Sequence, residues 1–424
     1  MSHPIWELWT PKQRERMGGM LTLLGREDLY DGFPIVQVAG TNGKGSVCHY
    51  LDNILRVAGY RVGLFTSPHL YHETERIKVN GEEVAQEWLT ETLDVLYQAH
   101  PDLRLFDAYL YAAIRYFEQQ QVDIAVFETG LGGGMDVTSA LLPILSCTCT
   151  IGLDHTQILG DTLSEIAIHK AGIAKPGVPM VLYPVQQPEA KEAFLAECSR
   201  LNSHVIPLAS EEIAITEKEG RVSFTLHHGP FRLRNVRVPL LGRHQAYNAA
   251  TAALCVRLLG TRRFPVEKES IIQGIETTVY HGRLEILGQS PLILLDGAHN
   301  EEGARSLVDA VSALAGGRSI TLLAAIMADK DAAGVAGVLA PLCRRVITTL
   351  AKEERGLDPG ELAQHYRSCG VDASPIRDPQ EAFDYALKST PKEGILLIAG
   401  SLYLPQAIGL VDGALPKPMD PNPS

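Results

Sequence analysis

Residues 36–50 read VQVAGTNGKGSVCHY, and this stretch decides which fold the surrounding chain must build. Residues 35–39 are apolar and rich in β-branched side chains, as in a buried strand, and small residues follow where the chain must turn tightly. In a loop that opens a helix, backbone N–H groups converge on phosphate oxygens, a lysine neutralises their charge and a hydroxyl reaches a metal. We therefore interpret residues 40–46 as a phosphate-binding loop.

A glycine-rich turn without a ligand is the alternative interpretation, but it leaves Lys44 unexplained. The spacing from Gly40 is one residue shorter than in the common GxxxxGK[ST] pattern, and Ala39 can take the place of the earlier glycine. The motif thus indicates a bound nucleotide and leaves the class of NTPase open.

Length and composition limit the number of domains, the partners and the cellular compartment that the protein can have. A chain of 424 residues with 45% hydrophobic residues is long enough for roughly two or three domains with sizeable cores. The formal charge of −12 argues against nucleic acid or an anionic membrane as a partner. The seven cysteines form no C-x-x-C pair, which fits a reducing compartment and predicts no zinc site. The N-terminal segment does not resemble a signal peptide and no apolar run approaches about 18 residues, so we expect a cytoplasmic protein.

Apolar runs alternate with helix-period segments along the chain, which predicts an α/β fold with a parallel sheet covered on both faces. The pattern begins with FPIVQVAG and resumes with PLILLDGAHN after a break at HGRLEILGQSP. We expect a nucleotide-binding domain with the phosphate-binding loop over residues 1–280, a linker over 281–291 and a smaller second domain over 292–413. Residues 414–424 contain several prolines and are expected to be a disordered tail.

Polar residues follow successive strand candidates. Because ligands of open α/β sheets gather outside the carboxyl ends of the strands, these residues should lie near one another. They are 40–46, Thr66 and Ser67, Glu128, Asp154 and His155, and 296–300. A carboxylate, a hydroxyl and a histidine beside phosphate oxygens suit Mg²⁺.

Each residue has a plainer interpretation when it is considered alone. Asp154 could cap a helix that begins at DHTQ, His155 could be a core histidine, Glu128 could pair with a cation, and Ser67 could belong to an ordinary turn. Their joint position at strand ends, in a chain with a phosphate-binding loop, favours a site for Mg-ATP or Mg-GTP in a cleft between two domains.

Eleven sequence blocks, in order, resemble the Mur ligase superfamily and, within it, the folylpolyglutamate synthase/dihydrofolate synthase family. They are VAGTNGKGS (38–46), LFTSPHL (64–70), ERI (75–77), ETGLGG (128–133), IGLDHTQILGDTL (151–163), KAGIAKPG (170–177), GRHQAYNAA (242–250), GRLEIL (282–287), LLDGAHN (294–300), MADKD (327–331) and GSLYL (400–404). The resemblance implies a P-loop parallel-sheet ATPase domain of the Mur ligase central type, followed by a smaller Rossmann-like α/β domain.

The same resemblance implies an ATP-dependent amide ligase. Such an enzyme phosphorylates a carboxylate, and the amine of L-glutamate then attacks the acyl phosphate to give an amide, ADP and phosphate. The expected acceptor is a reduced folate, with dihydropteroate as a further acceptor. The family resemblance also implies a monomer that uses small-molecule substrates, with no nucleic-acid or membrane partner.

Motif by motif, the resemblance implies roles for individual residues. The phosphates of ATP would contact Gly43, Lys44, Gly45 and Ser46. One Mg²⁺ would be held by Ser67, Glu128 and His155. A second Mg²⁺ would be held by Lys170 after carbamylation, which turns a cation into an oxygen ligand. The rest of the nucleotide would contact Gln245, Asn248, Arg283 and Asp296. The incoming glutamate or the transferring phosphate would be held by Arg76, His299 and Ser401. The residues closest to the chemistry would be Lys44, Lys170, His299 and Arg76.

Three of these residues also have structural interpretations. Arg76 could pair with Glu73 or Glu75 on the surface, Arg283 could merely bridge the domains, and Ser401 could begin a helix.

Four positions depart from the family pattern, namely Arg104, Gly134, His169 and the pair Tyr280-His281. Two alternatives to a folate ligase therefore stay open. One is a Mur-type ligase that joins an amino acid to another carboxylic acid, and the other is a nucleotide-binding paralogue without turnover.

Overall fold

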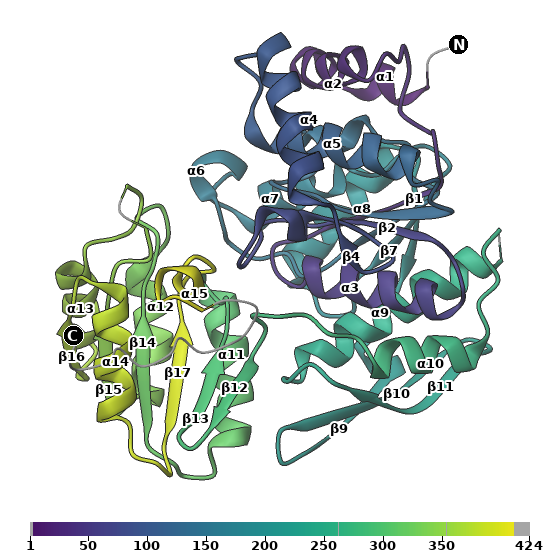
Figure 1. Ribbon diagram of the computed structural model, residues 1–424. Coiled ribbons are helices and arrows are strands. Elements are labelled where there is room, and N and C mark those ends of the chain that lie inside the picture. The colour runs from purple at the N-terminus through teal and green to yellow at the C-terminus, as the bar shows by residue number, and fades with distance from the viewer. Residues whose placement is uncertain (1–2, 262, 353, 411–424) are drawn as a thin grey trace.

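The computed structural model describes residues 3–261, 263–352 and 354–410. The tail expected over 414–424 lies outside the described residues. Two α/β bodies lie side by side, the larger one built from the N-terminal part of the chain and the smaller one from the C-terminal part (Figure 1). A small antiparallel sheet lies below the larger body in the same view.

The larger body is organised around an eight-stranded sheet. Its strands lie in the order β4 (Glu82–Glu83), β3 (Ile77–Val79), β2 (Val62–Phe65), β5 (Ile124–Glu128), β1 (Ile35–Ala39), β6 (Leu145–Thr148), β7 (Pro179–Leu182) and β8 (His204–Pro207). In this spatial order, β2 and all the strands that follow it are parallel, and β3 and β4 add an antiparallel edge beside β2. Every residue of β1 and β5 is buried, as expected for strands covered on both faces.

Helices cover both faces of this sheet. The α-helices are α1 (Ile5–Leu8), α2 (Pro11–Leu23), α3 (Lys44–Val57), α4 (Gln86–Ala99), α5 (Leu105–Gln119), α6 (Thr156–Leu159), α7 (Leu163–Ala171), α8 (Pro188–Arg200), α9 (His244–Gly260) and α10 (Lys268–Glu276), and the short 3₁₀ helices are η1 (Glu73–Arg76), η2 (Val137–Ala140) and η3 (Ser210–Glu212). One hydrophobic core joins α2, α5 and α7 to one face, and a second core joins α3 and α9 to the other. The carboxyl ends of the strands therefore stay open to a ligand.

The small sheet is an antiparallel meander of β9 (Ile213–Lys218), β10 (Arg221–His228) and β11 (Phe231–Val238). The sequence analysis does not predict it. Its buried side chains, among them Phe224 and Leu233, join the same core as α9 and α10. The meander thus extends the larger body.

The smaller body contains a six-stranded sheet in the order β12 (Glu285–Gln289), β13 (Leu292–Leu295), β17 (Ile395–Ala399), β14 (Ile320–Ala324), β15 (Arg345–Thr348) and β16 (Asp372–Pro375). All neighbouring pairs are parallel except β12 with β13. Its helices are α11 (Glu301–Ala315), α12 (Ala332–Leu339), η4 (Ala340–Leu342), α13 (Pro359–Ser368), α14 (Pro379–Ser389) and α15 (Leu404–Ala407). The linker expected over 281–291 includes β12, so part of it belongs to the sheet.

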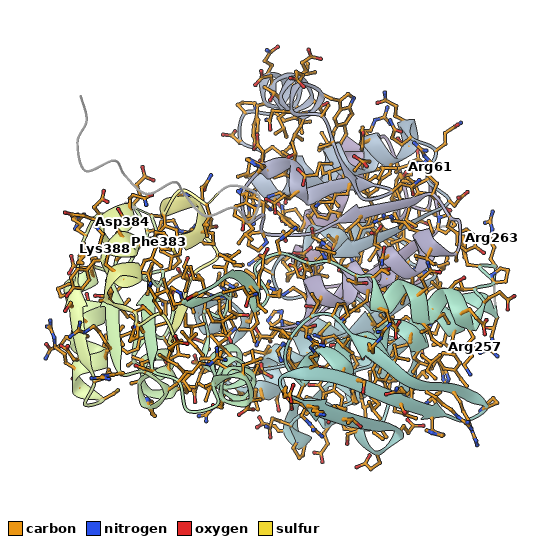
Figure 2. The ribbon with its side chains drawn as sticks, turned by 60° about the horizontal axis from the view of Figure 1, so that its bottom comes forward. Arg61, Arg257, Arg263, Phe383, Asp384 and Lys388 are labelled. Atoms are coloured by element: carbon orange, nitrogen blue, oxygen red, sulfur yellow. The ribbon has the colours of Figure 1, made fainter. Side chains whose placement is uncertain are left out.

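Charged side chains lie at the periphery and apolar ones point inward. In Figure 2, Arg61, Arg257 and Arg263 extend from the outside of the larger body. On α14 the buried Phe383 contrasts with the exposed Lys388. The predicted architecture, a parallel-sheet N-terminal domain followed by a smaller α/β domain, is confirmed.

Candidate active site

The loop between β1 and α3 has the backbone that a phosphate site needs. Gly43 precedes the first residue of α3 and has a φ of 89°. A Cβ at Gly43 would lie 2.8 Å from Oδ1 of Asn248, and one at Gly40 would lie 2.7 Å from Cβ of Cys149. Only glycine fits both places, so the N-terminus of α3 can approach an anion closely.

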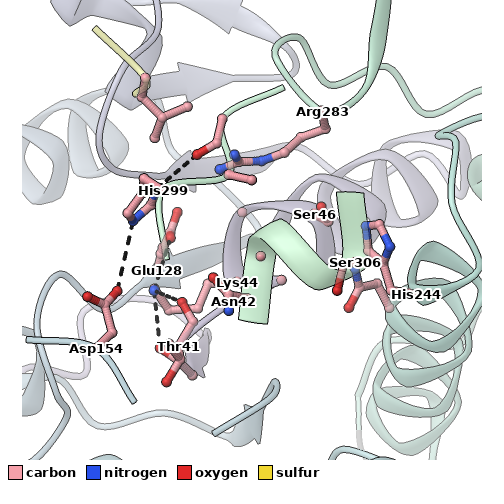
Figure 3. Close-up of a pocket in the computed structure, with 18 of the residues that line it drawn as sticks. Thr41, Asn42, Lys44, Ser46, Glu128, Asp154, His244, Arg283, His299 and Ser306 are labelled. Atoms are coloured by element: carbon pink, nitrogen blue, oxygen red, sulfur yellow. Dashed lines mark hydrogen bonds and ion pairs between the residues drawn. The ribbon is translucent and has the colours of Figure 1, made fainter. Parts of the chain in front are cut away.

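Lys44 and Glu128 face each other at the ends of two adjacent strands. Nζ of Lys44 donates to the carbonyl oxygens of Gly40 and Thr41, at 3.1 Å each, and lies 4.0 Å from Oε1 of Glu128. Oε2 of Glu128 accepts from the backbone N–H of Ser67 at 3.1 Å. Burial raises the pKa of Glu128, although Lys44 opposes the shift. Figure 3 shows the Lys44 amine pointing toward Thr41 and Glu128.

Lys170, on the last turn of α7, is buried against the same loop. Its Nζ donates to the carbonyl oxygen of Gly40 at 2.8 Å. Burial, and then the neighbouring charge of Lys44, lower the pKa of Lys170 to about 7. A large fraction of this amine is therefore neutral near pH 7, which is the form that reacts as a nucleophile.

Asp154 connects the two domains. Its Oδ1 accepts from Nζ of Lys330 at 2.6 Å, and its Oδ2 accepts from Nδ2 of Asn300 at 3.1 Å. Nε2 of His299 lies 3.9 Å from the same Oδ2. Burial alone would raise the pKa of Asp154, but the Lys330 ammonium and the neighbouring histidines hold it well below its usual range. The carboxylate is therefore ionised and faces groups from the smaller domain.

The interpretation of Asp154 as a helix cap is wrong. Helix α6 begins at Thr156, its N-cap is His155, and no side chain caps it. Asp154 accepts only from the backbone N–H of His155 in this turn, at 2.8 Å.

His299 is held as a neutral imidazole. Its Nδ1 lies 2.8 Å from the carbonyl oxygen of Gly297, a contact in which the ring N–H donates. Burial and the charge of Lys330 lower the pKa of His299 to about 4. Nε2 is therefore the unprotonated nitrogen, and in Figure 3 it points toward Asp154.

A second group of polar side chains lies on the far side of the loop. On α9, Nδ2 of Asn248 donates to Oε1 of Gln245 at 3.0 Å, and Nε2 of Gln245 donates to Oγ of Ser46 at 3.3 Å. The three side chains are buried and hold one another beside the first turn of α3.

Arg283 and Asp296 enter the site from the linker and the smaller domain. The two oxygens of Asp296 accept from the backbone N–H groups of Leu284 and Ala298, at 2.8 Å each. The guanidinium of Arg283 lies 5.2 Å from the ring centre of Tyr280. Because the segment around Arg283 is fixed by Asp296, the linker forms a wall of the site.

These groups surround one cavity of about 210 Å³ between the domains. Most of the residues predicted for the site line it, namely Gly43, Lys44, Gly45, Ser46, Ser67, Glu128, His155, Lys170, Gln245, Asn248, Arg283, Asp296 and His299. Arg76 and Ser401 do not line it.

Arg76 is not among the residues that line this cavity. Its Nε donates to Nδ1 of His69 at 2.9 Å, and its guanidinium lies 4.9 Å from the ring centre of Tyr109. The two glutamates suggested as its partners bond elsewhere: Glu73 accepts from Tyr109, and Glu75 accepts from backbone N–H groups. The surface ion pair is thus not the arrangement that the structure shows.

Ser401 is buried after β17, and its Oγ accepts from the backbone N–H of Tyr403 at 3.2 Å. The helix that follows, α15, has Tyr403 as its N-cap residue, so Ser401 does not begin it.

No group of three or more histidine, cysteine, aspartate or glutamate side chains is arranged to hold a metal within the ranges that the structure describes. The donors near the loop are instead the Ser67 hydroxyl, the Glu128 carboxylate and the His155 imidazole. Such a mixed set suits Mg²⁺ when nucleotide phosphates and water supply the other oxygens. The buried Glu128 carboxylate, whose pKa is raised, would gain from a nearby divalent cation.

The sequence analysis assigned no role to several residues that complete the site. Nδ2 of Asn42 donates to Oε2 of Glu302 at 2.9 Å across the domains, and Lys330 reaches Asp154. Lys330 belongs to the quoted block MADKD, a few residues after β14. Extending the search for strand-end residues to the segment after β14 would have identified it.

Comparison with known families identifies both halves of the chain. Residues 38–256 match the Mur ligase middle domain, and residues 282–402 match the Mur ligase, glutamate ligase domain. The folylpolyglutamate synthase of Lacticaseibacillus casei is 32% identical over 388 residues, which are 88% of this chain and 88% of that protein. A Haloferax volcanii protein named "Probable bifunctional folylpolyglutamate synthase/dihydropteroate synthase" is 32% identical over 404 residues, and there the match covers 92% of this chain but only 47% of the relative.

Solved structures agree with these relatives. Escherichia coli FolC in complex with DHPP and ADP superposes with a TM-score of 0.82 at 29% identity, covering 92% of this chain and 90% of that one. A bifunctional folylpolyglutamate synthase/dihydrofolate synthase with Mn, AMPPNP and L-glutamate bound gives a TM-score of 0.81 at 27% identity, covering 92% and 91%. No helix in the described part of the chain has the length and apolar character of a membrane span.

Proposed function

The chain belongs to the folylpolyglutamate synthase/dihydrofolate synthase family of Mur ligases, and from this membership we propose that it is an ATP-dependent ligase that adds L-glutamate to reduced folates. Dihydropteroate is a further proposed acceptor, because relatives carry both activities in their names. The observation that carries the proposal is that one interdomain cavity brings together Lys44, Glu128, Lys170 and His299.

The reaction proceeds in two steps. A carboxylate oxygen of the acceptor attacks the γ-phosphorus of ATP, ADP leaves, and an acyl phosphate forms. The amine of glutamate then attacks the acyl carbon, the C–O bond to phosphate breaks, and inorganic phosphate leaves as the amide forms. A carboxylate alone is a poor acceptor for an amine, so phosphorylation provides the leaving group.

The chain stabilises the first step by electrostatics. Backbone N–H groups at the start of α3 and the Lys44 ammonium face the position of the β- and γ-phosphates. The ammonium bonds to the carbonyl oxygens of Gly40 and Thr41, and these bonds hold it beside the loop, where it can donate to a bound phosphate. The charge that develops on the transferring group therefore meets a preorganised cation.

For the metals we propose one Mg²⁺ on Ser67, Glu128 and His155 and a second on carbamylated Lys170. A divalent cation in this site supplies charge neutralisation of phosphate oxygens. The lowered pKa of Lys170 supports carbamylation, since only the neutral amine combines with CO₂. Mn in a related structure supports a divalent cation, while the number of ions and the carbamate belong to this proposal.

For the glutamate we propose Arg76, His299 and Ser401 as binding residues. The unprotonated Nε2 of His299 can accept a hydrogen bond from the attacking amine, and this helps to orient it. Arg76 provides a partly buried guanidinium for a carboxylate, which its present partner, the His69 ring, does not neutralise.

The remaining contacts to the nucleotide are proposed to come from Gln245, Asn248, Arg283 and Asp296. The domain boundaries given above, a monomeric state and a cytoplasmic location also belong to it.

The test is incubation of purified protein with Mg-ATP, bicarbonate and labelled L-glutamate, with dihydropteroate, dihydrofolate and tetrahydrofolate offered separately. Mass spectrometry should show one added glutamyl residue on a folate, with matching phosphate release. Products from dihydropteroate would add the synthase activity. ATP binding without any pterin product would reject the folate acceptor and favour a ligase for another carboxylic acid or a protein without turnover.

A further inference from the structure

Lys330 crosses from the smaller domain to the larger one at the edge of the active site. It lies between β14 and α12, and its side chain is 9% exposed. Its Nζ lies 2.6 Å from Oδ1 of Asp154 and 3.2 Å from Nε2 of His155. One ammonium group therefore contacts two consecutive residues of the larger domain, and one of them is the proposed metal ligand His155.

The contact with His155 occupies Nε2, one of the two ring nitrogens that can bind a metal. An ammonium group has no lone pair and can only donate, so Nε2 of His155 is the acceptor in this contact. A ring nitrogen has a single lone pair, so Nε2 cannot accept from Lys330 and bind a metal ion at the same time.

We propose that a divalent cation binds His155 through Nε2, and that Lys330, a built-in cation beside Asp154 and His155, must leave Nε2 when that cation binds. The proposal rests on the assignment of His155 as a metal ligand under the proposed function. It makes Lys330 a positioning residue that couples metal loading to a contact between the domains.

Other contacts across the same cleft do not involve His155. Nδ2 of Asn300 donates to Oδ1 of Asn42 at 3.1 Å and to Oδ2 of Asp154 at 3.1 Å. Asn42 also donates to Glu302 at 2.9 Å. These bonds can hold the domains together while Lys330 moves, so the exchange requires rearrangement of the loop at Lys330 and no separation of the domains. The released ammonium stays beside the cavity, where anionic substrates bind.

The first experiment measures Mn²⁺ binding directly, without nucleotide or folate. Electron paramagnetic resonance of free Mn²⁺ gives the dissociation constant for the wild type, Lys330→Gln, Lys330→Arg and Arg355→Gln. Arg355 is the matched control. Its guanidinium lies near the same loop, 3.9 Å from the Asp329 carboxylate, but does not contact His155. Circular dichroism and thermal melting establish that each variant is folded.

We expect Lys330→Gln to bind Mn²⁺ about tenfold more tightly than the wild type, because the ion no longer competes with a charge a few ångströms away. Lys330→Arg and Arg355→Gln should stay within about twofold of the wild type. Binding by Lys330→Gln that is equal to or weaker than the wild type would overturn the proposal.

A second experiment follows the lysine itself. The rate at which an amine-reactive reagent labels Lys330, measured by peptide mass spectrometry, should rise when saturating Mn²⁺ is added to the wild type. An unchanged rate would show that the ion does not displace the ammonium. Ligation of folates is assayed in parallel. Tighter Mn²⁺ binding by Lys330→Gln, with no folate product from the wild type, would support this inference and reject the proposed function. Equal or weaker Mn²⁺ binding by Lys330→Gln, with a folate product from the wild type, would reject this inference and support the proposed function.

Discussion

The Lys170 ammonium donates a hydrogen bond to the carbonyl oxygen of Gly40 across 2.8 Å, and this bond joins the end of α7 to the first residue of the phosphate-binding loop. The proposed second metal ligand and the phosphate site therefore form one structural unit. Because burial and the charge of Lys44 lower the pKa of this amine to about 7, a large fraction of Lys170 is in the neutral form that can react with CO₂.

Lys170→Ala should reduce ligation by about a thousandfold or more while changing ADP affinity by less than about threefold, because the phosphates have their own loop. Initial rates and calorimetric titration with ADP measure the two effects. A ¹³C-bicarbonate NMR signal from the carbamate should be present in the wild type and absent from the variant.

Lys175→Met is the matched control for this prediction. Lys175 is also buried and its pKa is also lowered to about 7 by burial, but its Nζ lies 5.3 Å from the ring centre of Trp9, away from the loop. This variant should keep the carbamate signal of Lys170. Full ligase activity in Lys170→Ala would remove the carbamate from the account.

Gly43→Ala should weaken ATP binding by about tenfold or more, because the new Cβ would need a left-handed backbone and would meet Oδ1 of Asn248 at 2.8 Å. Gly59→Ala provides the control at the other end of α3, where φ is 92° and nothing lies within 4 Å. Both variants should lose about 1 kcal/mol of stability, and only the first should lose nucleotide affinity. Equal ATP affinities would count against the position assigned to the phosphates.

Glu128→Gln should weaken Mn²⁺ binding in the presence of ADP by about tenfold or more, since an amide oxygen carries no charge to offset the cation. The amide can still accept from the backbone N–H of Ser67, so the fold should be preserved. Electron paramagnetic resonance checks the first expectation and thermal melting the second. Unchanged metal affinity would place the ion elsewhere.

Asp52 predicts a pH dependence of stability. Burial raises its pKa from 3.8 to about 6, and Oδ1 has no hydrogen-bond partner, while Oδ2 pairs with Arg56 at 3.2 Å. Because the folded state holds the proton more tightly than the unfolded state, the free energy of unfolding falls as pH rises from about 4 through 6.

Asp52→Asn should flatten that part of the profile and stabilise the protein by about 1–2 kcal/mol at pH 8. Urea unfolding at several pH values measures this effect. A variant as pH-dependent as the wild type between pH 4 and 6 would contradict the assignment to Asp52.

The strand–loop–helix around Lys44 could be predicted from the sequence because its signals are local, namely an apolar run, glycines at the turn and a helical period. Glu128 and Ser67 could be predicted to approach it because parallel strands end at one edge of a sheet. The antiparallel meander was missed, although Phe224 and Leu226 alternate with polar residues in the strand RVSFTLHH.

Contacts between the domains could not be predicted in the same way. Lys330 and Asp154 are 176 residues apart, and their pairing depends on how two separately folded sheets are placed. The local interpretation of Asp154 as a helix cap was wrong for the same reason, because the carboxylate bonds to the other domain. Within the larger domain, Arg76 bonds to His69 and stacks on Tyr109, and the neighbouring glutamates in the sequence did not suggest either partner.

The most direct test of the central claim uses tetrahydrofolate whose glutamyl γ-carboxylate carries ¹⁸O, incubated with the protein, Mg-ATP and L-glutamate. If the carboxylate is phosphorylated before the amine attacks, the phosphate released as the first glutamyl residue is added must contain one ¹⁸O atom. Mass spectrometry of phosphate and folate should show this equal transfer. A glutamylated folate with unlabelled phosphate, or labelled folate with no glutamate added, would contradict the account.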